Sequence, residues 1–156
     1  MRIFLAIIAL LLFAATASSQ SIKMKMPTVT PAAGEEVLAF EFSDTIPIFN
    51  AGPSQPRVKF QFVKIKKTRG ASTNELFKRS VNFTFTPELT FEFFDSNNIL
   101  YYKIVLKAVT IHHFSFLSPE CTGCNELMHQ IWFDFDVIEA TDVATGNMVR
   151  YDRGAK

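Results

Sequence analysis

Hydrophobic and polar residues alternate along most of the chain after residue 20, with the period of two that is typical of β-strands with one buried face. In "RVKFQF" (residues 57–62) the apolar residues occupy even positions. From Val63 onward they occupy odd positions, with Ile65 next. This change of parity predicts a strand with a β-bulge near Phe62–Val63.

Other stretches show the same alternation, and each predicts a strand with a defined buried set. The sets are Leu38, Phe40 and Phe42; Val81, Phe83 and Phe85; Leu89, Phe91 and Phe93; and Ile131, Phe133, Phe135 and Val137. Pro87 should separate the second set from the third, because proline cannot donate to a strand ladder. "LYYKIVLKAVTI" (100–111) is apolar on both parities, as expected of a central strand. Residues 50–56, 95–98 and 144–147 are rich in turn-forming residues.

One segment, "ASTNELFKRS" (71–80), breaks the strand pattern. Ser72 can cap a helix, and Glu75 three residues later completes a capping-box arrangement. The segment also carries a short apolar stripe and two basic residues in its last turn, where cations are favoured. We therefore predict a mainly β fold, a small antiparallel β-barrel or sandwich with one short flanking α-helix at about residues 72–79.

The N-terminus has the three parts of a secretory signal: a positive start, the apolar run "IFLAIIALLLFAA" and small residues. The run is too short to span a membrane, which takes about 20 residues. We predict a signal peptide at 1–19, cut near Ser19/Gln20, with an uncleaved anchor as the alternative. Residues 20–156 should then form a single domain in an extracellular or, in a Gram-negative host, periplasmic compartment.

Four segments of the mature chain resemble the Hcp family, the tube proteins of type VI secretion. They are "SIKMKMPTV" (21–29), "FVKIKKTRGASTNELFKRS" (62–80), "YYKIVLKAVTIHHFSF" (101–116) and "ELMHQIWFDFDVIE" (126–139). The last two are similar to family strands that read Y-x-K-I-x-L-x-x-V-x-V and E-x-V-x-F-x-F-x-x-I. The helix segment departs from the family pattern, because Arg69 and Thr73 replace its Asp and Pro.

This resemblance implies a small β-barrel with one flanking helix, packed as hexameric rings that stack into a tube. It implies no catalytic residues. Tube proteins of the family leave the cell through the secretion machine without a signal peptide, and this chain departs from them there. Two explanations stay open: a relative secreted by the general pathway, or a barrel reused outside the cell.

Charge excludes some partners. The chain has 16 Lys and Arg and 15 Asp and Glu, and Arg2 leaves with the signal, so the mature net charge is 16 − 1 − 15 = 0. A neutral chain favours neither nucleic acid nor an anionic membrane surface. No Gly-rich phosphate loop is present, and we expect no cofactor. Asn82-Phe83-Thr84 is a glycosylation sequon, which matters only in a eukaryotic host.

The two cysteines, Cys121 and Cys124, form a C-x-x-C with three interpretations. A redox centre would need the first cysteine at a helix N-terminus, whereas it follows a strand-like run. A zinc site would add His113 (or His112) and His129 to the two cysteines. A disulfide that staples a loop fits an oxidising compartment best.

Charges are also segregated along the sequence. Residues 57–79 hold eight basic residues and one acid, whereas residues 120–142 hold six acids and no Lys or Arg. Either the two segments pair across strands within the barrel, or they form complementary surfaces on neighbouring subunits. Asp134 and Asp136 point the same way from one strand, which we interpret as a solvated face rather than a catalytic pair.

Two functions remain. The first is a secreted, non-enzymatic structural protein that binds copies of itself in rings, stacks or a matrix. The alternative is a secreted small β-barrel that binds an apolar ligand or a protein partner. No G-x-S-x-G or H-E-x-x-H motif is present, so we do not expect an enzyme.

Overall fold

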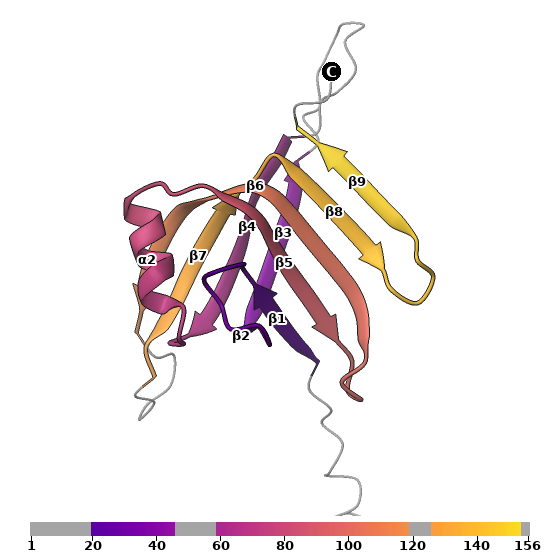
Figure 1. Ribbon diagram of the computed structural model, residues 1–156, viewed down its shortest axis with the longest axis horizontal. Coiled ribbons are helices and arrows are strands. Elements are labelled where there is room, and N and C mark those ends of the chain that lie inside the picture. Colours follow the sequence, from indigo (N-terminus) through magenta and orange to yellow (C-terminus); the bar gives the residue numbers. More distant parts are fainter. Residues whose placement is uncertain (1–19, 46–58, 119–125, 154–156) are drawn as a thin grey trace, which may run out of the picture.

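The computed structural model describes residues 20–45, 59–118 and 126–153 (Figure 1). Its strands are β1 (Ser21–Lys25), β2 (Glu35–Val37), β3 (Ala39–Thr45), β4 (Lys59–Thr68), β5 (Thr86–Phe94), β6 (Leu100–Leu117), β7 (Met128–Asp134), β8 (Val137–Asp142) and β9 (Met148–Asp152). The helix of the described part is α2 (Thr73–Val81). The predicted mainly β fold with one short helix is confirmed. The predicted signal peptide and both cysteines lie outside the described residues.

All strand pairs are antiparallel, and the strands follow the order β2-β1-β5-β6-β7-β4-β3. β8 pairs with β6, and β9 pairs with β8. The 18-residue β6 therefore lies between β5 and β8 in its first half and pairs with β7 in its second half. A register shift between Ile111 and His113 marks the start of the second half. The prediction of a central strand is confirmed.

The sheet curves around a core of aliphatic and phenylalanine side chains (Figure 1). Its two ends, β2 and β3, are consecutive in sequence and joined at Leu38, whose amide donates to the carbonyl of Lys66 at 2.8 Å. These two strands do not pair with each other, so the hydrogen-bonded sheet is not closed. Aromatic rings cross the interior, with Phe91 lying 4.9 Å from Phe40 and 6.1 Å from Phe133 between ring centroids. Phenylalanine thus fills the interior.

Most strand predictions agree with the structure. The predicted bulge is present, because one residue lies between Phe42 and Asp44 on β3 where two lie between Phe60 and Val63 on β4. The predicted sets of β5 and of β7–β8 face the core, although Phe93 is half-buried. In the first set Phe40 and Phe42 pack against the core, whereas Leu38 is 56% exposed.

The predicted strand over 81–85 is wrong. Val81 is the last residue of α2, Phe83 and Phe85 are exposed, and β5 begins only at Thr86. The helix ends in a Schellman motif instead, with the amides of Phe83 and Thr84 donating to the carbonyls of Ser80 and Arg79.

Pro87 does not separate two strands as predicted, because it lies inside β5. It precedes the part of β5 that pairs with β1, since that pairing begins at Thr90. The missing N–H therefore costs no bond to β1.

Candidate functional site

A buried polar cluster connects the start of α2 to two strands. Glu35 on β2 forms an ion pair with Lys67 on β4, and the distance from Lys67 Nζ to Glu35 Oε2 is 2.8 Å. Ser72, the N-cap of α2, donates its hydroxyl to Oε2 at 2.5 Å and its amide to Oε1 at 2.7 Å. Lys67 also donates to the carbonyl of Thr68 at 3.1 Å. The carboxylate of Glu35 therefore connects β2, β4 and the start of α2.

The predicted helix is confirmed, but its predicted capping box is wrong. The hydroxyl of Ser72 caps no amide of its own helix, because it is bound to Glu35. Glu75 forms an ion pair at 3.1 Å with Arg79 one turn later. The buried carboxylate replaces the local partner that a capping box would use.

Glu35 stays ionised at neutral pH. Burial alone would raise the pKa of Glu35, but hydrogen bonds from Lys67 and Ser72 and the charge of Lys67 outweigh it and hold that pKa below its usual value. Gly70 gives the carboxylate room, because a Cβ at that position would lie 2.8 Å from Glu35 Oε2. The site has the chemistry of a structural ion pair.

His129 on β7 lies next to this cluster. It pairs across the strands with Lys67, is fully buried, and neither ring nitrogen has a hydrogen-bond partner within the described structure. Its ring centroid lies 5.3 Å from that of Phe114 and 5.2 Å from that of Phe116. Burial first, then the charges of Lys67 and Arg69, lower the pKa of His129. The neutral imidazole is the form that this environment favours.

The opposite face of the same sheet carries a second aromatic group. Phe62 and His112 stack at 4.2 Å between ring centroids, and His113 lies 4.9 Å from Trp132. Lys64 Nζ lies 5.1 Å from the centre of the Trp132 ring. These rings cover one another and lie on the outer surface of β4, β6 and β7.

The structure does not bring His113 and His129 together. His113 pairs with Trp132 on the outer face, and His129 is three residues from Trp132 on the same strand, so its side chain points inward. Cys121 and Cys124 lie outside the described residues. Within the described ranges no three His, Cys, Asp or Glu side chains gather as a metal site.

The two charged segments lie side by side as β4 and β7. Ion pairs of the described residues in these segments include Lys64–Glu41, Lys67–Glu35, Arg79–Glu75, Asp134–Arg153 and Glu139–Lys107, and none of these five joins the two segments. Both explanations of the segregated charge stay predictions. Asn82, the predicted glycosylation acceptor, is the exposed C-cap of α2.

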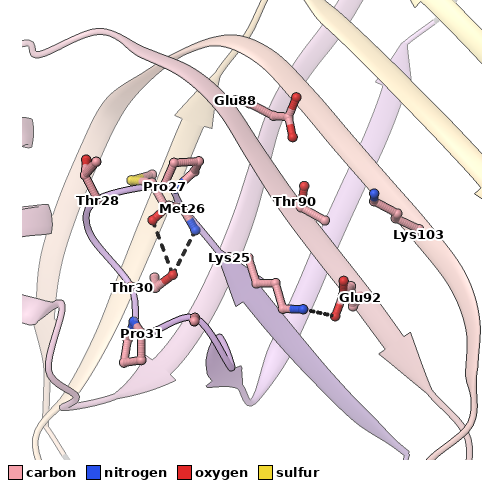
Figure 2. A pocket seen from close by; sticks show the side chains of 11 residues that line it. Lys25, Met26, Pro27, Thr28, Thr30, Pro31, Glu88, Thr90, Glu92 and Lys103 are labelled. Carbon is pink, nitrogen blue, oxygen red and sulfur yellow. Dashed lines mark hydrogen bonds and ion pairs between the residues drawn. The ribbon is translucent and has the colours of Figure 1, made fainter.

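A hollow of about 440 Å³ lies between the loop after β1 and the outer face of β5 and β6 (Figure 2). Lys25 Nζ contacts Glu92 at 2.8 Å on its floor. Thr30 holds the loop by accepting from the amide of Met26 and donating to its carbonyl. The other walls include Glu88 and Lys103. The lining is mixed, because apolar surface is added by Met26, Pro27, Pro31 and Ala32.

Exposed apolar side chains gather in two places. The helix patch lies on and after α2 and comprises Phe77, Val81, Phe83 and Phe85. The hairpin patch lies around β8 and β9 and comprises Tyr101, Val143 and Met148. In Figure 1, α2 and the β8–β9 hairpin occupy opposite sides of the molecule.

Two features of the site were missed by sequence reasoning, although a signal was present. Lys67 continues the inward parity of Val63 and Ile65, and His129 continues that of Ile131 and Phe133. A charged or titratable residue at an inward position indicates a buried partner or a functional constraint.

The arrangement of a curved antiparallel sheet with one helix on its flank is the Hcp fold. The chain superposes on Hcp1 from Salmonella typhimurium with a TM-score of 0.72, at 15% identity over 86% of this chain and 95% of that chain. The secreted protein Hcp3 from Pseudomonas aeruginosa gives a TM-score of 0.67, at 12% identity over 88% and 100% of the two chains. A type VI secretion system effector from Yersinia pestis gives 0.68, at 13% identity over 84% and 98%.

No family model matches the sequence, and no curated protein matches it. At these identities the structural likeness establishes the fold, which confirms the fold that the sequence resemblance implied. Within the described ranges, no helix is long and apolar enough to cross a bilayer.

Proposed function

We propose that the mature chain is a secreted, non-enzymatic structural protein that binds copies of itself head to tail. The observation that carries this proposal is the position of the helix patch and the hairpin patch on opposite sides of one subunit. Exposed apolar clusters mark interaction surfaces. Two different patches that bind each other form a heterologous interface, which closes into a ring or extends as a filament.

Further support comes from the fold. Hcp3, a structural neighbour, is described as a secreted protein. Rings or stacks of the kind that the Hcp resemblance implies would be built by this contact.

Variants in each patch test the contact. Phe83→Ser/Phe85→Ser disrupts the helix patch, Val143→Ser/Met148→Ser disrupts the hairpin patch, and Leu38→Ser is the control because it removes an exposed apolar side chain outside both patches. We expect native mass spectrometry to show oligomers of the wild-type and control proteins and monomers of each patch variant.

Mixing the two patch variants gives the sharper result. Each variant retains one intact patch, so a heterologous contact predicts dimers and nothing larger in the mixture. Monomeric wild-type protein at micromolar concentration in low salt would refute the proposal.

The alternative of a barrel that holds an apolar ligand inside has less support. Phe91, Phe133 and Phe135 fill the interior, and the lining of the hollow in Figure 2 carries charged side chains as well as apolar ones. A copurifying apolar ligand would favour that alternative instead.

A further inference from the structure

His129 is enclosed by three secondary-structure elements. On β6 its neighbours are Phe114 and Phe116, which cannot titrate. From α2, the ring of Phe77 covers both phenylalanines, at 5.5 Å and 5.7 Å between centroids. We call these four residues, Phe77, Phe114, Phe116 and His129, the aromatic cage. α2 therefore contacts β6 through the aromatic cage, and His129 is the titratable residue of this cage.

The charged groups that face this ring are cations. Lys67 pairs with His129 across β4 and β7, and Arg69 follows β4. Among the described residues the buried acid is Glu35, whose carboxylate is already bound by Lys67 and Ser72. On α2, Glu75 is paired with Arg79. A proton on His129 would add a second buried cation next to Lys67, and Glu35, the buried acid among the described residues, is already bound by Lys67 and Ser72.

We propose that His129 is a pH-sensitive latch that holds α2 against the sheet while its ring is neutral and releases the helix when the ring takes up a proton. When α2 is released, water can solvate the protonated ring. The free-energy cost of opening the helix is then smaller than the cost of keeping an unpaired cation buried among apolar side chains. Release also exposes the parts of Phe77, Phe114 and Phe116 that pack against one another, although Phe77 and Phe116 are already about half exposed. The latch does not require the self-association proposed above, although α2 also carries part of the helix patch.

The direction with pH follows from the proton balance. Burial and the two cations lower the pKa of His129 in the closed state, whereas the opened ring regains the ordinary value of 6.5. Opening then takes up one proton, so the fraction of opened α2 should rise about tenfold per pH unit as the pH falls below about 6.5. Glu35 stays ionised through this range because its pKa lies below its ordinary value of 4.5.

Amide hydrogen exchange tests the latch in the mature wild-type protein from pH 7.5 to pH 5.0, with each rate divided by its intrinsic rate at that pH. We expect opening of α2 amides to increase about tenfold per unit below about pH 6.5, while amides of the core strand β5 stay protected. Equal increases in α2 and β5 would indicate global unfolding and overturn the proposal.

Two variants assign the effect to one histidine. His129→Phe keeps an aromatic ring without a titrating group and should abolish the pH dependence of α2. His113→Gln removes an exposed histidine from the outer face and should behave as the wild type. An unchanged pH dependence in His129→Phe overturns the proposal.

A direct titration covers the case in which His129→Phe fails to fold. The ring resonances of His129 in the wild-type protein should titrate below 6.5 or broaden as α2 opens. Titration of this ring at or above 6.5 without a change in α2 would overturn the proposal.

Discussion

Lys67 and Glu35 form an ion pair of 2.8 Å in which the two side chains are only 1% and 9% exposed. The lysine comes from the inward face of β4, and the carboxylate comes from β2, beside the point where the two ends of the sheet meet. Because Ser72 binds the same carboxylate, the pair also fixes where α2 begins. A single buried charge pair therefore fixes the relative positions of the sheet ends and the helix.

Removing one partner of this pair should be costly. We expect Lys67→Met to lower the free energy of unfolding by about 3–5 kcal/mol, because it leaves the Glu35 carboxylate buried without its cation. The double variant Lys67→Met/Glu35→Leu should recover much of that loss. Urea unfolding measures each value. Lys64→Met, which breaks the exposed pair with Glu41, is the control and should cost below about 1 kcal/mol. Equal losses at both lysines would contradict the burial argument.

Stability should also depend on acid through Glu35. The pKa of this carboxyl is lower in the folded protein than its ordinary value of 4.5, so its contribution is present above about pH 4.5 and is lost as the pH falls through the folded value. We expect the wild type to be more stable than Glu35→Gln at pH 7, with the difference shrinking between pH 5 and pH 3. Chemical unfolding at several pH values gives this difference. A constant difference across that range would show that the carboxylate charge is not involved.

Gly70 and Gly146 should respond differently to alanine. A Cβ at Gly70 would meet the Glu35 carboxylate at 2.8 Å, so Gly70→Ala must displace the buried cluster and should cost about 1–3 kcal/mol. Gly146 has open space but a φ of +71°, so Gly146→Ala should cost only the backbone strain of about 1–2 kcal/mol. A double cycle separates the two causes: with Glu35→Ala the cost of Gly70→Ala should fall, and the cost of Gly146→Ala should not change.

Period-two alternation predicted most strands because it reports directly which face of a strand is buried. The buried cluster could not be predicted in the same way, because it joins residues 35, 67 and 72 through the tertiary fold. Alternation also misled over 81–85, where apolar residues follow a helix end. There a Schellman motif places Phe83 at a position that glycine usually occupies, and local hydrogen bonds determine the backbone whatever the hydrophobic pattern.

That unusual helix end gives a stabilising change. Phe83 has a φ of +50° and is 74% exposed, so it carries backbone strain and buries little surface. We expect Phe83→Gly to raise the free energy of unfolding by about 0.5–1 kcal/mol, because glycine adopts this conformation without strain. Phe85→Gly is the matched control, since Phe85 is also exposed but is not among the residues with positive φ. The control should be neutral or destabilising in thermal unfolding, and stabilisation by both variants would refute the strain argument.

The N-terminal and cysteine predictions can be tested together by intact mass. Expressed from its full gene in a secretory host, the protein should lose residues 1–19 and begin near Gln20. Its mass should also be lower by the two thiol hydrogens of Cys121 and Cys124, because an oxidising compartment favours their disulfide. The small loop that this disulfide closes limits its effect to about 2 kcal/mol, so Cys121→Ser/Cys124→Ser should fold with modestly reduced stability. Two free thiols per chain would exclude the disulfide. One zinc ion per chain would instead assign the cysteines to a metal site, and it would require ligands other than the pair His113 and His129, which lie on opposite faces of the sheet.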